Sequence, residues 1–433
     1  MRHPDLQSWL SWQESLHSSE IDLGLDRVRQ VATNMGIEPV WSIPVVTVAG
    51  TNGKGSSVAM LEALYHHAGF RTGSYTSPHL LQYNERIKID RQPVSDDLIC
   101  RAFDKIDNAR QKTDGREISL TYFEFGTLAA LSILHDADLD LVILEVGLGG
   151  RLDAVNIIDA AIALITPIAL DHQSWLGDSR EVIAGEKAGI IKAGSRVVYN
   201  DSEPAQAVID KAEQSKVSLD QLADDYVVVL SDDRHWQFKN SSVEIKNLPR
   251  PSLEGDFQLN NAAAVIQVSQ LLNERLAVKE SAIKNALVDI RLAGRFQTIR
   301  TKPDIIVDVA HNAHAVKALA VNLQQQAVKG RTLALVALLE DKAICDALKQ
   351  IDEQIDQYFL AGLQGSRTLS ASQLQQRLQE CISSDKLLLN DSVPAAIEQV
   401  LSVATEDDRI IIFGSFITVS DAMQVLIRTE PGD

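Results

Sequence analysis

One stretch, "VVTVAGTNGKGSS" at 45–57, constrains the fold more than any other part of the chain. Its apolar residues at 45–48 predict a buried strand, and the apolar spacing in 56–68 predicts a helix that Gly69 ends. Glycine is costly to order, so a glycine-rich turn between these elements needs a reason. Bare N–H groups followed by a helix N-terminus form an anion site. The stretch therefore predicts a phosphate-binding loop.

Two side chains of this loop suit a nucleotide. Lys54 would reach the terminal phosphates, and the hydroxyl of Ser56 would bind Mg²⁺. The sequence of the loop departs from the standard P-loop pattern GxxxxGK[ST]. Gly50 lies only three residues before Gly53, and Gly55 separates Lys54 from Ser56. The alternative is a glycine-rich turn with a solvated lysine.

The rest of the N-terminal part repeats the order strand, loop, helix. Further strands are predicted at 141–146, 161–165 and 196–199, and the apolar run 160–170 is too short to span a bilayer and suits a buried strand. Residues 200–250 suggest antiparallel strands at the periphery of the same domain. The pattern predicts an α/β, doubly wound fold.

A second set of elements follows residue 298. Strands are predicted at 305–309, 333–338 and 410–413, with a helix at 313–326. A chain of 433 residues is too long for one ordinary core. We therefore expect a doubly wound N-terminal ATPase domain with the phosphate loop, 1–293, and a smaller Rossmann-like α/β C-terminal domain, 297–433.

Bulk properties narrow the partners and the compartment. The formal net charge of −18 argues against nucleic acid or an anionic membrane as the main partner. The three cysteines, Cys100, Cys345 and Cys381, include no CxxC pair, which predicts a reducing compartment without a disulfide framework. The first twenty residues are too polar for a signal peptide. We expect a cytoplasmic protein.

Candidate metal ligands follow two other strands. Glu145 ends a buried strand, where an ionised carboxylate is costly unless it is paired or metal-bound, although a water-exposed strand end is the alternative. Asp171 and His172 follow the strand near 165, at the sheet edge where doubly wound folds bind ligands. From the residues alone, Lys187 is a solvent-facing lysine on a helix.

The motifs together resemble a known family. The segments "AGTNGKGS", "SPHL", "LTYFEFGTLAAL", "EVGLGGRLDA", "ALDHQSWLG", "EKAGI", "GRF" and "DVAHNAHA" occur in this order over nearly the whole chain. In this they are similar to the dihydrofolate synthase/folylpolyglutamate synthase family of the Mur ligase superfamily. The modified phosphate loop is the variant of that superfamily, and the joint match is highly specific.

The resemblance implies a role for each matching residue. It places ATP contacts at Gly53, Lys54, Gly55, Ser56, Asn261, Arg295 and Asp308. It places Mg²⁺ ligands at Ser56, Ser77, Glu145 and His172, and a carbamylated lysine that supports the metal at Lys187. It places the pterin pocket of bacterial forms with both activities at Asp22, Leu23, Gly24, Thr121, Leu152, Asp153 and Ala154. Lys54, Lys187 and His172 are the implied catalytic residues.

The chain departs from the family at one position. The family often has His-Gln before its "xxNAA" stretch, whereas Phe257 precedes Gln258 here, and the choice of Asn261 over Asn260 depends on register. His311 is a candidate for orienting the glutamate or a phosphate. For Asp308 and His311 the alternative is a loop that closes on itself before a helix.

The implied reaction forms an amide between a carboxylate and L-glutamate. ATP would activate the carboxylate of dihydropteroate or a reduced folate as an acyl phosphate, with Mg²⁺ and Lys54 neutralising the repulsion between anions. Closure of the second domain would exclude water.

The alternatives are a folylpolyglutamate synthase alone and a regulatory ATPase. A cell-wall Mur ligase usually carries an extra N-terminal domain, for which a phosphate loop near residue 50 leaves no room. The family implies a monomer.

Overall fold

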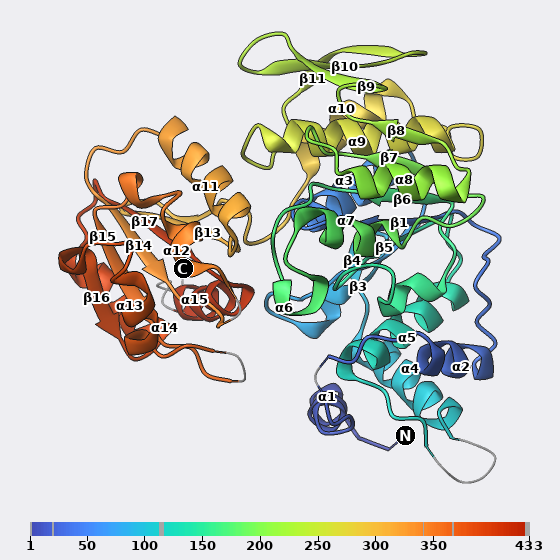
Figure 1. Ribbon diagram of the computed structural model, residues 1–433, viewed down its shortest axis with the longest axis horizontal. Helices are drawn as coiled ribbons and strands as arrows, with labels where there is room; N and C mark the ends of the chain where they lie inside the picture. The colour runs from blue at the N-terminus through green and yellow to red at the C-terminus, as the bar shows by residue number, and fades with distance from the viewer. Residues whose placement is uncertain (1, 20, 112–116, 341, 366–367, 429–433) are drawn as a thin grey trace. The chain divides into compact units, whose positions relative to one another are not determined.

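The computed structural model describes residues 2–19, 21–111, 117–340, 342–365 and 368–428 (Figure 1). The chain divides into two compact units that are interleaved along the sequence. Unit 1 comprises Met1–Ile168, Ser179–Ser252 and Gln258–Ile290, and unit 2 comprises Ala169–Asp178, Leu253–Phe257 and Arg291–Asp433. The domain limits 1–293 and 297–433 stay a prediction. Within the described ranges, no helix has both the length and the apolar character needed to cross a membrane.

Unit 1 is built on an eight-stranded sheet of order β4-β3-β2-β5-β1-β6-β7-β8 (Figure 1). The strands β2, β5, β1, β6, β7 and β8 pair in parallel, and β3 and β4 add antiparallel pairs at the β2 edge. The three central strands are buried at every position, as expected for a sheet covered on both faces. The strands are β1 Val45–Ala49, β2 Thr72–Tyr75, β3 Ile87–Ile89, β4 Gln92–Pro93, β5 Leu141–Glu145, β6 Ile162–Ile165, β7 Arg196–Tyr199 and β8 Leu219–Gln221.

Helices cover both faces of this sheet. Helices α3 and α10 pack together on one face, and α4 and α5 pack together on the other (Figure 1). The helices are α1 Leu6–Glu14, α2 Asp26–Asn34, α3 Lys54–His67, α4 Asp96–Ala109, α5 Tyr122–Asp136, α7 Arg180–Ala188, α8 Gln206–Ser215, α9 Phe257–Leu272 and α10 Glu280–Asp289, with 3₁₀ turns η1 Tyr83–Arg86 and η2 Ala154–Ile157. The predicted one-sided helix at 56–68 is instead buried all round from Ser56 to Tyr65, because α10 covers the side that faces away from the sheet.

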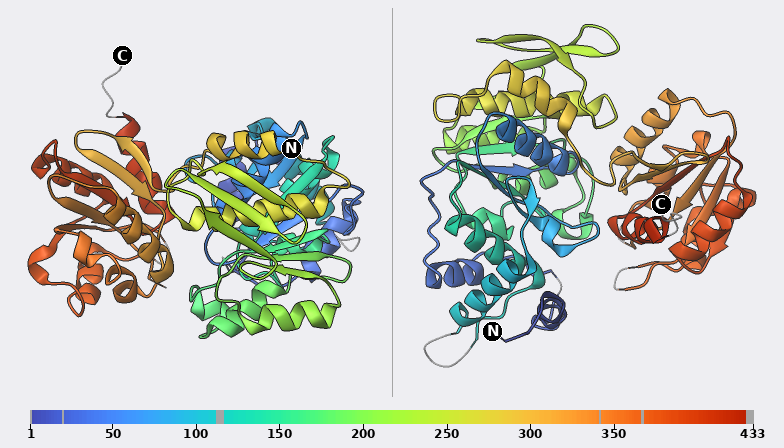
Figure 2. Two further views of the ribbon diagram at one scale, coloured as in Figure 1. Left: turned by 90° about the horizontal axis from the view of Figure 1, so that it is seen from above. Right: turned by 180° about the vertical axis from the view of Figure 1, so that it is seen from behind.

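Two predictions for this region need correction. The buried strand expected over 160–170 ends at Ile165, and the residues after it form the loop that approaches the phosphate loop. Residues 200–250 are not all antiparallel, because α8 and the parallel strand β8 come first. Only β9 Tyr226–Leu230, β10 His235–Asn240 and β11 Glu244–Pro249 form an antiparallel sheet, which contacts α10 (Figure 2).

Unit 2 has a six-stranded sheet of order β12-β13-β17-β14-β15-β16, parallel except for β12. The strands are β12 Gln297–Arg300, β13 Asp304–Asp308, β14 Thr332–Val336, β15 Gln357–Ala361, β16 Leu387–Asn390 and β17 Arg409–Phe413. The helices are α6 Gln173–Leu176, α11 Ala313–Gln325, α12 Ile344–Leu348, α13 Ala371–Leu378, α14 Val393–Val403 and α15 Phe416–Arg428, with 3₁₀ turns η3 Asp352–Gln354 and η4 Ser384–Lys386. The predicted second α/β fold is therefore confirmed.

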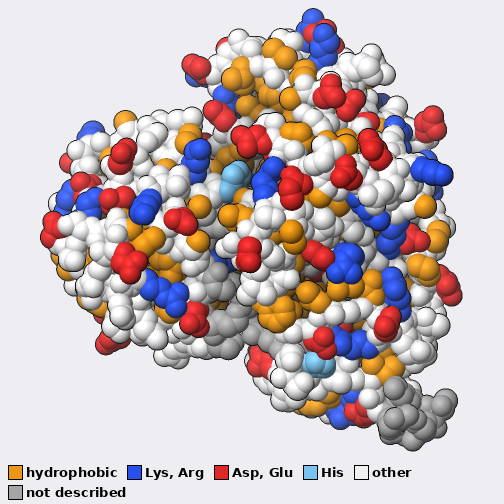
Figure 3. Space-filling view, in the orientation of Figure 1, with side chains coloured by type: hydrophobic (Ala, Val, Ile, Leu, Met, Phe, Trp, Pro, Cys, Tyr) orange, Lys and Arg blue, Asp and Glu red, His pale blue; other side chains and the backbone are white. Residues whose placement is uncertain are grey.

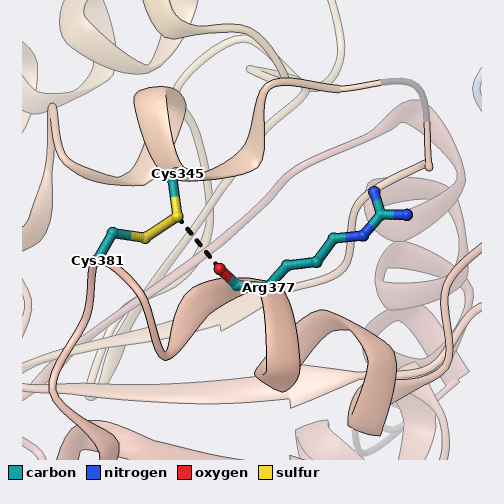
Figure 4. Close-up of a disulfide and its surroundings, with 3 residues drawn as sticks. All are labelled: Cys345, Arg377 and Cys381. Atoms are coloured by element: carbon teal, nitrogen blue, oxygen red, sulfur yellow. Dashed lines mark hydrogen bonds between the residues drawn. A yellow bond between two sulfur atoms is a disulfide. The ribbon is translucent and has the colours of Figure 1, made fainter.

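A disulfide in unit 2 contradicts the prediction from cysteine spacing. Cys345 on α12 and Cys381 after α13 are joined, with their Cα atoms 5.9 Å apart (Figure 4). Cys345 Sγ also lies 3.2 Å from the carbonyl oxygen of Arg377 on α13. The bond closes a segment of 36 residues and ties two helices of one core together. Cys100 is a free, buried cysteine in unit 1.

The exposed surface mixes residue types. On the face shown in Figure 3, acidic and basic side chains are interspersed. Large exposed apolar side chains such as Val40, Val182 and Leu230 lie in separate segments, namely the loop before β1, helix α7 and strand β9. Single exposed apolar residues are normal on protein surfaces, so they carry no functional argument.

Candidate active site

The phosphate loop joins β1 to α3 and requires glycine at two positions. A Cβ atom on Gly50 would lie 1.9 Å from Thr166 Oγ1, and Gly50 has a φ of 150°. Gly53 has a φ of 91°, which L residues with side chains rarely adopt, and its Cβ atom would lie 2.9 Å from Asn261 Oδ1. The glycines thus allow the loop after β6 and the helix α9 to touch the phosphate loop directly.

Two lysines meet at one carbonyl oxygen of this loop. Lys54 Nζ donates to the Gly50 carbonyl at 3.0 Å, and Lys187 Nζ donates to the same oxygen at 2.9 Å. Lys187 is only 5% exposed, so the expectation of a solvent-facing lysine was wrong. The residue lies in the last turn of α7, and its backbone packs against the turn that follows β5. The structure therefore brings Lys54 and Lys187 together, over 133 positions of sequence.

Glu145 and Ser77 lie together beside the same loop. Glu145 ends β5, is buried, and is paired in register with Val48 on β1, two residues before Gly50. The backbone N–H of Ser77 donates to Glu145 Oε2 at 3.2 Å. A Cβ atom on Gly147 would lie 3.2 Å from Ser77 Oγ, so the turn after β5 also approaches this hydroxyl.

The donor set fits Mg²⁺. Ser56, Ser77 and Glu145 supply hydroxyl and carboxylate oxygens, the hard ligands that Mg²⁺ prefers. Within the described part of the chain, no group of three or more His, Cys, Asp or Glu side chains could hold a metal. Mg²⁺ usually takes only one or two carboxylates and fills its other positions with water and substrate phosphates, so such a group is not required. His172 lies in the segment grouped with unit 2, and its role as a ligand stays a prediction.

A relay of amide side chains supports Ser56. Asn200 Nδ2 donates to Asn261 Oδ1, Asn261 Nδ2 donates to Gln258 Oε1, and Gln258 Nε2 donates to Ser56 Oγ, at 2.9, 2.9 and 3.3 Å. Asn261 is buried and faces the loop, whereas Asn260 is partly exposed. Sequence reasoning missed Asn200 and Gln258, because their partners are distant in the sequence.

Phe257, which stands where the family often has histidine, is not a member of this relay. Its ring is 40% exposed, and the next residue, Gln258, makes the contact with Ser56. The only sequence signal for Gln258 was its position beside the family's Asn motif.

The predicted pterin residues come from three segments that converge on α5. Thr121 is the buried N-cap of α5, and η2, which begins at Ala154, contacts both α2 and α5. Asp153 is buried and caps η2, accepting from the backbone N–H groups of Leu148 at 2.8 Å and Val155 at 3.1 Å. Leu152 is partly exposed and Ala154 is buried. Asp22 lies in the segment with Leu23 and Gly24 before α2, and is tied to α5 through a salt-bridge network.

The turn at 147–154, which carries Leu152, Asp153 and Ala154, packs directly against α7. A Cβ atom on Gly150 would lie 2.9 Å from the carbonyl oxygens of both Glu186 and Lys187. The N–H of Arg151 donates to the Glu186 carbonyl at 2.8 Å. The turn at 147–154 and the helix end that carries Lys187 therefore pack backbone against backbone.

In unit 2, Arg295 and His311 both lie beside the ring of Phe416, and Asp308 lies near the charges of these two side chains. The guanidinium of Arg295 lies 5.3 Å from the centre of the Phe416 ring, and the ring of His311 lies 6.4 Å from it. Asp308 accepts from the backbone N–H groups of Phe296 at 2.8 Å and Ala310 at 2.7 Å. The bond to Ala310 fits the alternative interpretation, a loop that closes on itself, whereas the bond to Phe296 reaches another segment. The ATP contacts of Arg295 and Asp308 and the glutamate contact of His311 stay predictions.

A buried ion pair in unit 2 was not foreseen. Asp171 Oδ1 accepts from Lys342 Nζ at 2.5 Å, while Asp171 Oδ2 accepts from Asn312 Nδ2 at 3.1 Å and lies 3.3 Å from His311 Nε2. Burial would raise the pKa of Asp171, but the hydrogen bond and charge of His311 and the charge of Lys342 outweigh it and hold that pKa well below its usual range. Asp171 is therefore a carboxylate that fixes the segment before α6 within unit 2.

Two family models and several known proteins match this chain. The model of the Mur ligase middle domain matches residues 48–269, and that of the Mur ligase glutamate ligase domain matches residues 294–416. The dihydrofolate synthase/folylpolyglutamate synthase of Escherichia coli is 39% identical over 428 residues, covering 99% of this chain and 97% of that protein. The protein of the same name from Haemophilus influenzae is 37% identical and covers 97% of each chain.

Solved structures agree over the same length. The E. coli FolC in complex with DHPP and ADP superposes with a TM-score of 0.90 at 39% identity, with 98% of each chain covered. A bifunctional folylpolyglutamate synthase/dihydrofolate synthase with Mn, AMPPNP and L-glutamate bound gives a TM-score of 0.88 at 39% identity, again with 98% of each chain covered.

Proposed function

The chain belongs to the dihydrofolate synthase/folylpolyglutamate synthase family of Mur ligases, and on that premise we propose that it adds L-glutamate both to dihydropteroate and to reduced folates. It is an ATP-dependent carboxylate–amine ligase that uses a divalent metal ion. The observation that carries the proposal is the phosphate loop, on which two lysines share the Gly50 carbonyl beside the buried Glu145.

The proposed chemistry begins with activation of a carboxylate. A carboxylate accepts an amine poorly because its leaving group would be oxide, so its oxygen first attacks the γ-phosphorus of ATP, giving an acyl phosphate and ADP. Both reactants are anions, and Lys54 with the N–H groups of the loop reduces their repulsion and holds them in line. Ser56, Ser77, Glu145 and His172 would hold Mg²⁺, which would supply further charge neutralisation at the phosphates.

The second step forms the amide. The amine of L-glutamate attacks the acyl carbon, inorganic phosphate leaves, and the amine loses a proton. We assign the nucleotide contacts of unit 2 to Arg295 and Asp308 and a glutamate or phosphate contact to His311. The positions of Arg295 and His311 beside Phe416 support a shared role for these two residues.

The lysine pair supports carbamylation of Lys187. An unmodified Lys187 places an ammonium group on the same carbonyl oxygen as that of Lys54. Addition of CO₂ to the neutral amine, with loss of a proton, converts this group to a carbamate anion. Repulsion between the two side chains then becomes attraction, and the new anion supports Mg²⁺.

The proposal also covers the pterin pocket, the oligomeric state and the cellular compartment. We assign the pterin pocket to Asp22, Leu23, Gly24, Thr121, Leu152, Asp153 and Ala154, whose segments converge on α5. We also infer a monomer in the cytoplasm, with small molecules rather than nucleic acid or membrane as partners. The acidic net charge supports small molecules over nucleic acid or membrane as partners, whereas the Cys345–Cys381 disulfide is not typical of a cytoplasmic protein.

The test is phosphate release from ATP by the purified protein. Wells contain dihydropteroate, tetrahydrofolate or neither acceptor, each with and without L-glutamate. Release that requires glutamate together with either acceptor is the expected result. Release with tetrahydrofolate alone would reduce the function to folylpolyglutamate synthase. Steady release that is indifferent to both acceptors would indicate a regulatory ATPase.

The pH dependence of dihydropteroate turnover should report Asp153. Burial raises the pKa of Asp153 to about 6, although three backbone N–H groups oppose the shift. Above that pH the side chain is a carboxylate that accepts hydrogen bonds from the N–H groups of a pterin, and below it the carboxyl is neutral. We therefore expect kcat/KM for dihydropteroate to fall as the pH drops through about 6, because this quantity reports the free enzyme.

The matched variant is Asp153→Asn, which cannot titrate. Its kcat/KM should be lower at pH 8 and should lose the acidic limb. An acidic limb of the same midpoint in this variant would assign the titration to another group.

A further inference from the structure

Arg27 on α2 joins two segments that both carry proposed pterin residues. Its Nε donates to the two carboxylate oxygens of Glu124 at 2.8 and 2.9 Å. Its Nη1 donates to Asp22 Oδ2 at 2.5 Å, and its Nη2 donates to the backbone carbonyl of Asp22. One guanidinium thus holds the segment before α2 against the start of α5, 97 positions away.

Glu124 extends the link to Thr121. Glu124 Oε2 also accepts from the backbone N–H of Thr121 at 2.8 Å, and the Thr121 hydroxyl accepts from the N–H of Glu124 at 3.2 Å. This is a capping box, in which each residue satisfies a donor of the other at the first turn of α5. The position of Thr121 therefore depends on the same carboxylate that binds Arg27.

The two carboxylates that Arg27 binds differ in how much they depend on it, because they differ in burial. The side chain of Glu124 is only 4% exposed, and that of Arg27 is 22% exposed. A carboxylate at that depth needs a charged partner, whereas Asp22, with 42% of its side chain exposed, does not. Residues 21–24 lie outside any helix or strand, so hydrogen bonds to Arg27 fix where their backbone runs.

We infer that Arg27 is a positioning residue for the dihydropteroate site, which it forms by holding Asp22–Gly24 against Thr121. The inference rests on the proposed function, because the pocket itself is part of that proposal. Arg27 acts through Asp22 and Glu124 and takes no part in the transfer of phosphate. Its loss should therefore weaken dihydropteroate binding without affecting the use of ATP.

The test compares Arg27→Gln, Arg27→Lys and the control Arg29→Gln with the parent protein. Arg29 is exposed, two positions further along the same helix, and is expected to behave as the parent. For Arg27→Gln we expect KM for dihydropteroate to rise at least about tenfold, with KM for ATP and for L-glutamate within about twofold of the parent. Lysine keeps the charge but not the planar fork, so Arg27→Lys should recover part of the loss.

A folding defect is separated from a positioning role by a paired variant. Arg27→Gln leaves Glu124 buried and unpaired, so Arg27→Gln with Glu124→Gln removes both charges together. A variant whose thermal unfolding matches the parent but whose KM for dihydropteroate is raised supports positioning. Equal dihydropteroate KM values in the folded paired variant and the parent would overturn the inference.

Binding without turnover separates this inference from the function it rests on. The quenching of tryptophan fluorescence by dihydropteroate gives a dissociation constant for each variant with no other substrate present. A parent that binds dihydropteroate but releases no phosphate refutes the ligase while the comparison of variants still decides on Arg27. A parent that does not bind it overturns both.

Discussion

Replacing Lys187 by alanine is expected to lower kcat for glutamate ligation by about a hundredfold to a thousandfold, with partial recovery in acetate or another short carboxylate. Lys187 is buried and its Nζ lies on the Gly50 carbonyl beside Lys54. If a carbamate at this position supports the metal ion, its loss removes an anion from the site and leaves a space that a small carboxylate fills. The loss should be in kcat more than in KM for the folate substrate, because the lysine acts where charge develops.

The measurement is steady-state phosphate release by Lys187→Ala with and without added carboxylate. Lys239→Ala is the control, since Lys239 is exposed on β10 in the same unit. Intact mass of the parent in bicarbonate should show the addition of one CO₂, which the Lys187→Ala variant lacks. Full activity of the variant without additives would refute the carbamate role.

Reduction of the Cys345–Cys381 disulfide is expected to lower the free energy of unfolding of unit 2 by about 4 kcal/mol. The bond closes 36 residues, and the chain-entropy account assigns this magnitude to a loop of that length in the unfolded state. Both cysteines are partly exposed, so a reductant reaches them without prior unfolding. The bond ties α12 to the end of α13, whose apolar residues share one core.

Guanidinium denaturation with and without dithiothreitol measures the effect. Cys100→Ser should keep the response to the reductant, because Cys100 is not part of the bond. Replacing both Cys345 and Cys381 by serine should abolish the response and place the midpoint near that of the reduced parent. A parent whose midpoint does not move in dithiothreitol would show that the bond contributes no stability.

Local patterns could be predicted well from the sequence. The phosphate loop was predictable because strand, glycines and helix are adjacent and their dihedral needs are local, as the positive φ angles of Gly50 and Gly53 illustrate. Parallel strands were predictable from buried apolar runs, whereas the limits of the 160–170 run were not, since apolar residues also line loops that approach a buried site. Periodicity did not show that α3 is buried all round, because α10, which covers it, is distant in sequence.

Contacts between residues far apart in the sequence could not be predicted from local sequence patterns. Arg27 with Glu124, Lys342 with Asp171 and Gln258 with Ser56 each join residues about one hundred or more positions apart. The disulfide belongs to the same class, because nothing in a spacing of 36 residues indicates that two Cα atoms will lie 5.9 Å apart. Which of these side chains meet depends on how the helices and strands are arranged in three dimensions, and a local sequence pattern does not contain that information.

The contact of Gly150 with α7 bears on how substrate preference can evolve in this protein. Since the turn at 147–154 packs directly on the backbone of Glu186 and Lys187, a substitution that enlarges the pterin side of the turn also displaces the lysine on its other side. The segment at 21–24 is instead held by hydrogen bonds from the Arg27 side chain to Asp22. Mutational tolerance should therefore be unequal: a library randomised at 21–24 is expected to yield more active ligases with altered acceptors than one randomised at 150–154, and equal yields would argue against this coupling.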